Sequence, residues 1–210
     1  MGTRTKNLQR AAKGKKHLIF DFDETLFYIH PDWEGFKQDI NQCVKSYDAN
    51  LFETIIQQGW KWWELRTQTI KKHGKAIRQK IAELSLKWEQ TILRPSQKHQ
   101  ELIDWIIQHQ HAYTMHIRSS NHTTTINWYL QWYWLRDCFD IIVGMDTVEL
   151  IKQYPDGFYY IHHLHGAEKK EYLMIGDSKE RDGQAAKNAG IDFFHIDAST
   201  VNRENLDWWK

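Results

Sequence analysis

Short apolar segments alternate with amphipathic segments along most of the chain. A helical pattern precedes each of the last four apolar segments: one from Pro95, one over 121–136, one from Pro155 to Gly166, and one over 182–188 closed by Gly190. This order predicts an α/β fold, a doubly wound parallel five-stranded sheet with a Rossmann-like core. The apolar segments are rich in Ile, Val, Phe or Tyr and bounded by Asp, Gly or Ser, which is typical of buried β-strands: 17–22, 112–117, 139–144, 172–176 and 191–196.

The interval between the first two predicted strands has a different pattern. About 90 residues separate Phe22 from Ala112, far more than one crossover connection needs. Residues 36–93 contain no Pro and little Gly, and their apolar residues recur three to four positions apart. We therefore expect an α-helical cap of three or four helices over 30–94, inserted into a core domain formed by 17–29 and 95–210.

The composition narrows the class of protein. Of the 210 residues, 41% are hydrophobic and 26% are charged, which excludes a disordered chain and a collagen-like repeat. No apolar stretch approaches the roughly 18 to 20 residues of a membrane span, so no membrane association is expected. Cys43 and Cys138 cannot form a disulfide framework, and a reducing, cytoplasmic setting is the resulting expectation.

The net charge of +1 conceals an uneven distribution. Residues 1–17 carry +6 and no acid, residues 29–94 carry +3, and the remainder carries −8. We expect residues 1–16 to be a disordered, solvated basic tail. There are two alternatives: the tail contacts nucleic acid, or it is a transit peptide.

Polar side chains follow the first four predicted strands. The carboxyl ends of parallel strands meet at one edge of the sheet, where ligands bind in folds of this class. Carboxylates gathered there repel each other unless a cation is present, and oxygen ligands without His or Cys suit Mg²⁺. With a lysine beside the metal, such a site can position an anionic phosphoryl group. The residues concerned are Asp21, Asp23, Ser119, Ser120, Lys152, Asp177 and Asp182.

These residues occur in four motifs that resemble those of the haloacid dehalogenase-like hydrolase superfamily, in its phosphatase branch with an α-helical cap. The resemblance runs from about Lys16 to Asp197, and the cap sequence itself resembles nothing that we can name. Glu24 stands where many members have Gly. The motifs are Asp21-Phe22-Asp23-Glu24-Thr25, Ser119, Lys152-x-x-Pro155-Asp156-x-Phe158, and Gly176-Asp177-Ser178-x-x-x-Asp182.

The resemblance implies a role for each motif. Asp21 would be the nucleophile that forms an aspartyl-phosphate, and Asp23 would be the general acid and then the general base. Ser119 and Lys152 would hold the phosphoryl oxygens, with Ser120 as an alternative contact. Mg²⁺ would be held by the Asp21 side chain, the Asp23 backbone carbonyl, Asp177 and, through water, Asp182. Thr25 would support the loop.

The motifs favour phosphate hydrolysis over the other reactions of this superfamily. The dehalogenases of this superfamily lack an acid at the position of Asp23, because a halide leaving group needs no proton. We therefore expect a Mg²⁺-dependent phosphoric monoester hydrolase that acts on a small phosphorylated metabolite. The alternatives are a sugar-phosphate phosphotransferase or mutase of the same superfamily and a non-catalytic binding protein with this fold.

Two further clusters have simpler interpretations. His162, His163 and His165 are close in sequence, but they occur at mixed helical spacing without Cys, which favours solvated helix residues over a metal site. A tryptophan cluster in the predicted cap could stack a nucleobase, although packing within the cap is the simpler hypothesis. It is the first place that we would look for substrate choice: Trp60, Trp62 and Trp63.

Overall fold

The computed structural model describes residues 3–29, 32–59, 61–93 and 97–197. A parallel five-stranded sheet in the order β5-β4-β1-β6-β7 lies at its centre, as the sequence pattern predicts. Four of the five observed strands are shorter than the predicted segments, and β4 ends one residue beyond its segment. The five strands are β1 (His17–Phe20), β4 (Thr114–Arg118), β5 (Ile141–Val143), β6 (Tyr172–Gly176) and β7 (Asp192–His195).

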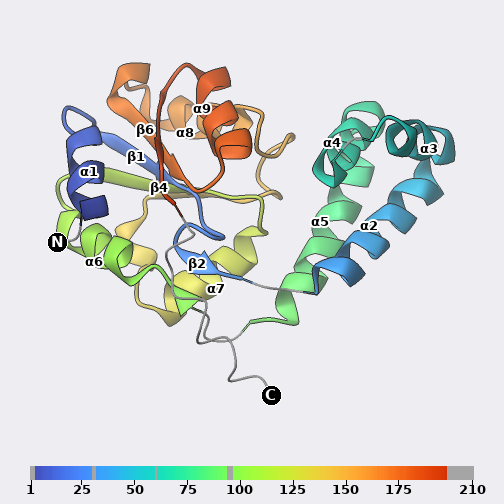
Figure 1. Cartoon of the computed structure of the whole chain (residues 1–210), viewed down its shortest axis with the longest axis horizontal. Helices are drawn as coiled ribbons and strands as arrows, with labels where there is room; N and C mark the ends of the chain where they lie inside the picture. Colours follow the sequence, from blue (N-terminus) through green and yellow to red (C-terminus); the bar gives the residue numbers. More distant parts are fainter. Residues whose placement is uncertain (1–2, 30–31, 60, 94–96, 198–210) are drawn as a thin grey trace.

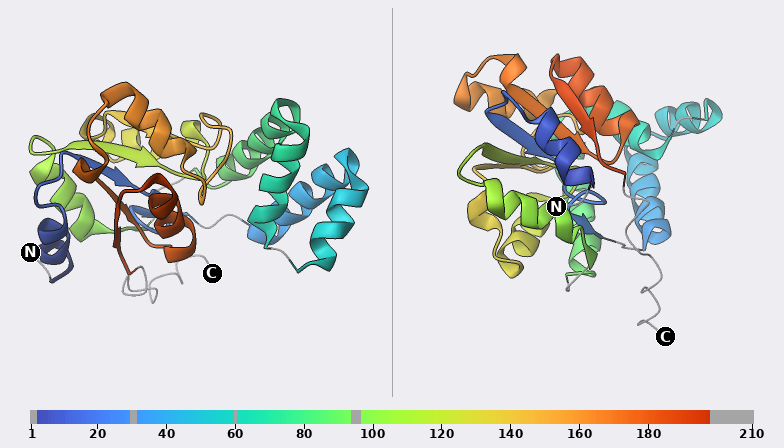
Figure 2. Two further views of the ribbon diagram at one scale, coloured as in Figure 1. Left: turned by 90° about the horizontal axis from the view of Figure 1, so that it is seen from above. Right: turned by 60° about the vertical axis from the view of Figure 1, so that its left-hand side comes forward.

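Helices cover both faces of this sheet (Figures 1 and 2). Successive residues of β1 point to opposite faces, so Leu18 and Phe20 pack in one hydrophobic cluster and Ile19 in another. The first cluster includes side chains of α1 (Thr3–Ala11), α6 (Gln100–His109) and α7 (Thr123–Trp132). The second includes side chains of α8 (Asp156–His165) and α9 (Gln184–Ala189). Short 3₁₀ or π turns lie at Arg136–Cys138, Lys169–Glu171 and Lys179–Gly183.

The predicted helix boundaries are confirmed where local signals specify them. Helix α8 begins directly after Pro155 and ends at Gly166, which takes the left-handed conformation at φ 66°. Helix α6 begins at Gln100, where the His99 ring accepts the backbone N–H of Leu102. The expectation that Pro95 opens this helix is wrong, because residues 97–98 form a short strand before the helix begins; Pro95 itself lies outside the described residues. None of the helices in the described part of the chain combines the length and apolar character that a membrane span needs.

A bundle of helices lies between β2 (Phe27–Tyr28) and β3 (Gln97–Lys98), two short strands that pair in antiparallel fashion. In Figure 1 this helical bundle stands beside the sheet domain. It has a hydrophobic core of its own, to which every one of its helices contributes. The bundle comprises α2 (Trp33–Tyr47), α3 (Ala49–Gln57), α4 (Trp62–His73) and α5 (Lys75–Gln90).

Contacts with the loop after β5 hold the bundle against the sheet domain. Met145 and Ile151 of this loop are buried in the hydrophobic core of the bundle. Arg78 of α5 donates a hydrogen bond of 2.7 Å to the backbone carbonyl of Val148. These contacts place the inner side of the bundle over the carboxyl ends of the strands.

The expectation of a disordered basic tail is wrong for the described residues of the N-terminal segment. Residues Thr3–Ala11 form helix α1, and the side chains of Leu8 and Ala12 are buried in the sheet domain. Thr5 donates a hydrogen bond of 2.9 Å to Glu101 of α6. The basic residues dominate the composition of this segment, but a few apolar residues at helical spacing suffice to dock it.

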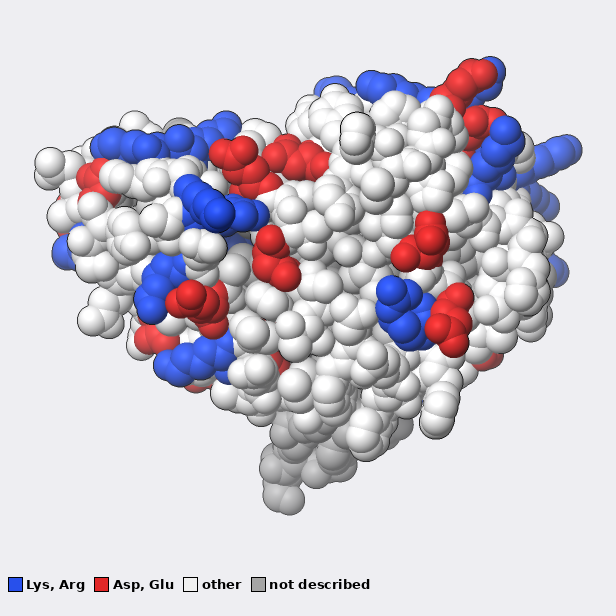
Figure 3. Space-filling model, turned by 180° about the vertical axis from the view of Figure 1, so that it is seen from behind, with Lys and Arg blue, Asp and Glu red and all other residues white. Residues whose placement is uncertain are grey.

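Basic and acidic side chains of the bundle are mixed on the side of the molecule shown in Figure 3. Figure 3 shows the side opposite to that of Figure 1, where Lys and Arg are interspersed with Asp and Glu over the bundle and the middle of the face carries little charge. The charge of +3 between residues 29 and 94 therefore does not form a continuous basic surface on this side. The position of each cationic side chain relative to the pocket therefore has to be considered separately.

Candidate active site

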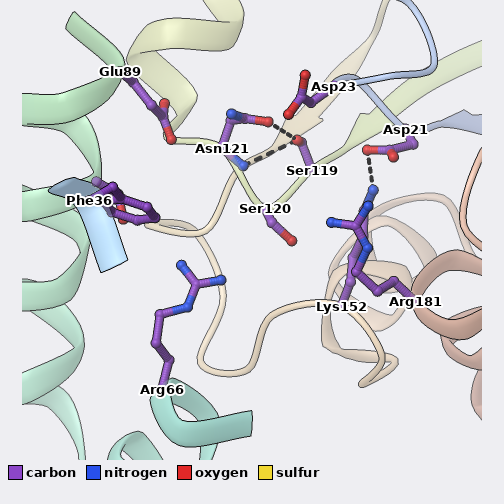
Figure 4. Close-up of a pocket in the computed structure, with 11 residues that line it drawn as sticks. Asp21, Asp23, Phe36, Arg66, Glu89, Ser119, Ser120, Asn121, Lys152 and Arg181 are labelled. Atoms are coloured by element: carbon purple, nitrogen blue, oxygen red, sulfur yellow. Dashed lines mark hydrogen bonds and ion pairs between the residues drawn. The ribbon is translucent and has the colours of Figure 1, made fainter. Parts of the chain in front are cut away.

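A pocket lies between the carboxyl ends of the strands and the helical bundle (Figure 4). Five of the predicted site residues line it: Asp21, Asp23, Ser119, Ser120 and Lys152. The remaining two, Asp177 and Asp182, form an acidic cluster with Asp21. The structure thus brings together all seven side chains that the sequence selected, although they come from four separate segments.

Lys152 lies between two carboxylates. Its ammonium group makes ion pairs with Asp21 and with Asp182, the latter at 2.7 Å. The residue is only 3% exposed, so these charges attract each other with little screening by water. Because Lys152 also lines the pocket, its ammonium group can neutralise an anionic ligand beside Asp21.

The acidic cluster has the composition of a site for a hard divalent cation. Asp21, Asp177 and Asp182 each offer one carboxylate oxygen, and these oxygens lie within 4.8 Å of one another. Burial raises the pKa of all three carboxyl groups, although Lys152 and Arg181 favour their charged forms. The cluster is therefore short of positive charge, which a bound cation would supply. Oxygen donors without nitrogen or sulfur fit Mg²⁺.

A glycine at the end of β6 makes room for the buried carboxylate of Asp182. A Cβ atom at Gly176 would meet the carboxylate of Asp182, so any larger residue there would displace it. The backbone N–H of Ser178 donates a hydrogen bond of 3.2 Å to the same carboxylate. The glycine of the fourth motif thus has a steric function, because it lets Asp182 approach the strand end.

Asp23 is a second carboxyl group in the pocket, and its surroundings differ from those of Asp21. Burial, with Asp21 and Glu24 nearby, raises the pKa of Asp23 well above its usual range. The backbone N–H of Ile29 donates a hydrogen bond of 3.0 Å to its Oδ1 and opposes that shift. The raised pKa makes the protonated form of Asp23 available closer to neutral pH, as a proton donor requires.

The loop between β1 and β2 is held by Thr25. Its buried hydroxyl group lies 3.5 Å from an oxygen of Asp21 and 3.4 Å from an oxygen of Asp177, and it accepts the backbone N–H of Asp177 at 3.1 Å. Thr25 thereby links the first motif to the fourth. Glu24 has a φ of 61°, a left-handed conformation that costs a non-glycine residue about 1 kcal/mol or more, which explains why Gly suits this position.

The loop after β4 presents its two serines differently. The Ser119 hydroxyl donates to the side-chain oxygen of Asn121 at 2.8 Å and accepts the backbone N–H of Asn121 at 3.1 Å. These bonds give Ser119 one orientation. Ser120 is half-buried, and in Figure 4 its hydroxyl points into the pocket. Asn121 also lines the pocket and is a residue that the sequence analysis missed, although it directly follows the two serines.

The helical bundle contributes residues that carried no recognisable sequence signal. Phe36 of α2, Arg66 of α4, and Ser85 and Glu89 of α5 line the pocket opposite the catalytic motifs. In Figure 4 the guanidinium group of Arg66 points toward the space in front of Ser120. Since Arg66 is 4% exposed, it is a desolvated cation facing the anion-binding side of the pocket.

The predicted tryptophan cluster does not coincide with these residues. The side chain of Trp63 is half-buried and stacks under the ammonium group of Lys61, 4.9 Å from the ring centroid, but it does not line the pocket. Trp60 lies outside the described residues, as does the side chain of Trp62. The selection of substrate by this cluster stays a prediction, and the pocket points first to Phe36 and Arg66.

Glu89 connects the bundle to the loop after β4. The backbone N–H of His122 donates to both of its carboxylate oxygens, at 3.3 and 3.0 Å. Burial nevertheless raises the pKa of Glu89 to about 7, because its side chain is almost completely removed from water. The protein therefore holds a carboxyl group that ionises near neutral pH at the contact between bundle and sheet domain.

Replacing Glu89 with Gln is expected to change how stability depends on pH. The pKa of Glu89 is about 7 in the folded state and about 4.5 in the unfolded chain, so the native state retains the proton of Glu89 to a higher pH. Glu89 therefore lowers the free energy of unfolding as pH rises from about 4.5 to 7, by about 3 kcal/mol in total. E89Q should be more stable than the wild type at pH 8 and similar to it at pH 4.5, measured by urea unfolding.

The control for this prediction is Glu83→Gln, which alters an exposed residue of the same helix. E83Q should follow the wild type within about 0.5 kcal/mol at both pH values. An equal difference between E89Q and the wild type at the two pH values would show that the ionisation of Glu89 is not responsible.

Comparison with known proteins identifies the family of the chain. A family model described as haloacid dehalogenase-like hydrolase matches residues 18–196. The pyrophosphatase PpaX of Halalkalibacterium halodurans is 28% identical over 174 residues, which cover 83% of this chain and 73% of that protein.

Solved structures show the same fold at low sequence identity. A HAD phosphatase from Thermococcus onnurineus is similar with a TM-score of 0.54 and 22% identity, covering 87% of this chain and 86% of that one. YfnB from Bacillus subtilis, solved with bound magnesium, has a TM-score of 0.54 and 17% identity, covering 87% and 86% of the two chains. With a family match across both the strand-end motifs and the inserted bundle, the chain belongs to the haloacid dehalogenase-like hydrolase family.

Proposed function

We propose that the protein is a Mg²⁺-dependent phosphatase that hydrolyses a small phosphorylated metabolite through an aspartyl-phosphate on Asp21. The observation that carries this proposal is the meeting of Asp21, Asp23 and Lys152 in one pocket beside an acidic cluster. The pocket supplies a nucleophile, a proton donor and a buried cation within reach of one ligand. A binding protein without catalysis would have no use for this combination of desolvated charges.

The first half of the reaction forms the covalent intermediate. A carboxylate oxygen of Asp21 attacks phosphorus, and the bond between phosphorus and the leaving oxygen breaks. Asp23 donates its proton to that leaving oxygen, so that an alcohol departs. Lys152, Ser119 and Ser120 bind the remaining phosphoryl oxygens and hold them in position.

The second half releases phosphate. Asp23, now ionised, accepts a proton from a water molecule, whose oxygen attacks phosphorus and breaks the bond to Asp21. Both carboxyl groups return to their starting states. Mg²⁺ would be held by Asp21, the Asp23 backbone carbonyl, Asp177 and, through water, Asp182, and when bound it would neutralise charge on the phosphoryl oxygens.

The bundle is proposed to act as a cap that excludes water and selects the leaving group. Arg66 and Phe36 face the pocket from this side, so a substrate with an anionic or polar group beyond the phosphoryl group fits the site. Because the relative from Halalkalibacterium halodurans is named a pyrophosphatase, pyrophosphate is a test substrate together with sugar phosphates, nucleoside monophosphates and phosphoglycolate.

Removal of the metal provides the first test. Phosphate release from at least one of these substrates should require Mg²⁺, fall to background in excess EDTA and return when Mg²⁺ is restored. Full activity in EDTA would contradict the proposed mechanism. Isomerised sugar phosphate with little free phosphate would instead identify a mutase, and no turnover of any substrate would favour the non-catalytic alternative.

A further inference from the structure

Three histidines meet at the edge of the sheet opposite the active site. His17 is the first residue of β1, and His116 lies in the middle of β4. Ile19 pairs with His116 in the parallel register, so His17 and His116 point to the same face of the sheet, two residues apart along the strands. His165, the last residue of α8, lies over them.

The nitrogen atoms of these rings converge. Each ring offers one nitrogen, and the three nitrogens lie within 4.8 Å of one another. His17 Nδ1 is 3.1 Å from His116 Nε2, and the ring centroid of His165 lies 4.7 and 4.9 Å from those of His17 and His116. Zn²⁺ binds imidazole at about 2.0 to 2.1 Å, so two nitrogens of a tetrahedral site lie about 3.3 Å apart. The separation of His17 and His116 is already close to that value.

Two of the three rings are buried. His17 and His116 are 7% and 0% exposed; Nε2 of His116 forms a hydrogen bond with Nδ1 of His17, and Nδ1 of His116, the other nitrogen of that ring, has no hydrogen-bond partner among the described residues. Apolar side chains would fill this space at lower cost, because a buried polar atom without a partner is unfavourable.

A carboxylate supports the third ring. Asp140, directly before β5, lies 2.8 Å from Nε2 of His165. When His165 donates its Nε2–H to Asp140, Nδ1 of the same ring carries the lone pair that a metal requires. A carboxylate that orients a histidine in this way is a common feature of zinc sites.

We propose that His17, His116 and His165 form a binding site for a transition-metal dication of the Zn²⁺ class, with Asp140 as the positioning residue. The nitrogen donors distinguish this site from the all-oxygen cluster of Asp21, Asp177 and Asp182, which suits a hard cation. The two sites lie at opposite ends of β1, about 13 Å apart along the strand. Water would supply the fourth ligand, because the side chain of His165 is 25% exposed.

The test uses the full-length protein, freed of metal by EDTA and then saturated with Mg²⁺ to occupy the acidic cluster. One equivalent of Zn²⁺ should bind in competition with a chromogenic zinc indicator, and Co²⁺ should give the visible absorption of a tetrahedral nitrogen site. His165→Asn should weaken Zn²⁺ binding at least tenfold and abolish that absorption. Asp140→Asn should also weaken binding, by about tenfold.

His163→Asn is the matched control, because His163 is exposed on the same helix and lies outside the cluster. It should bind Zn²⁺ as the wild type does. His165 lies at a helix end, so its variant is expected to fold, and circular dichroism checks this. Wild-type protein that binds no Zn²⁺, or equal affinity in the wild type and His165→Asn, would overturn the proposal. Neither outcome bears on the phosphatase, whose activity is measured separately with Mg²⁺.

Discussion

Replacing Asp21 with Asn should lower kcat for phosphate release by about 10⁴-fold or more. The amide of Asn is a poor nucleophile, so no covalent phosphoenzyme can form, and other groups of the site recover little of the lost rate. The variant should still fold, because Asn has nearly the same shape and removes one charge from a cluster whose carboxyl pKa values burial raises. Steady-state release of phosphate in saturating Mg²⁺ measures the effect.

The matched control for D21N is Asp104→Asn, which changes an exposed acid on α6, away from the pocket. D104N should retain wild-type kcat, and thermal unfolding should show that both variants are folded. A labelled substrate should form a phosphoenzyme that can be trapped with the wild type but not with D21N. Beryllofluoride, which mimics the phosphoryl group on an aspartate, should likewise bind the wild type only. Retention of more than a tenth of the wild-type kcat in D21N would rule out Asp21 as the nucleophile.

Asp23→Asn should produce a loss that depends on the leaving group. A general acid contributes about 10²- to 10⁴-fold when the leaving oxygen must be protonated. We therefore expect kcat/KM to fall by that factor for an alkyl phosphate such as a sugar phosphate. For p-nitrophenyl phosphate, whose phenolate leaves without a proton, attack by Asp21 should be affected far less. The comparison of the two substrates on one variant separates proton donation from structural damage.

The measurement for D23N is best made on both half-reactions. With p-nitrophenyl phosphate, the burst of nitrophenolate should persist while later turnover slows, because Asp23 is also the proposed base for the water. In the wild type, activity on alkyl phosphates should decline as pH rises through the raised pKa of Asp23, since the acid form is then lost. Equal losses for both substrates in the burst phase would contradict the role of Asp23 as general acid.

The sheet and the helices around it could be predicted because their signals are local. A run such as Tyr172–Gly176 is apolar throughout, as a strand buried on both faces must be, and its observed bounds equal the predicted ones. Pro155 and Gly166 likewise mark the ends of α8. The short strands β2 and β3 were not predicted, because two residues each give no periodic pattern and their pairing joins segments about 70 residues apart.

Helix α1 shows how composition can mislead. Six basic residues within 17 positions suggested a solvated arm, but Leu8 and Ala12 stand one helical turn apart and dock on the sheet domain. These apolar contacts stabilise the docked helix, while the basic side chains of Lys6 and Arg10 remain exposed to water. The density of charge therefore indicated which residues of this helix are exposed, but it did not predict that the helix packs on the sheet domain.

By itself, the sequence determined the fold class and the chemical residues at the strand ends, since both depend on local periodicity and on groups that directly follow a strand. Only the tertiary structure decided which side chains from distant segments face these strand-end residues. Arg66 and Glu89 enter the pocket only because the bundle docks on the loop after β5. His17, His116 and His165 meet only through strand register and the end of α8. Such contacts arise from packing between segments far apart in the chain, and no local pattern encodes them.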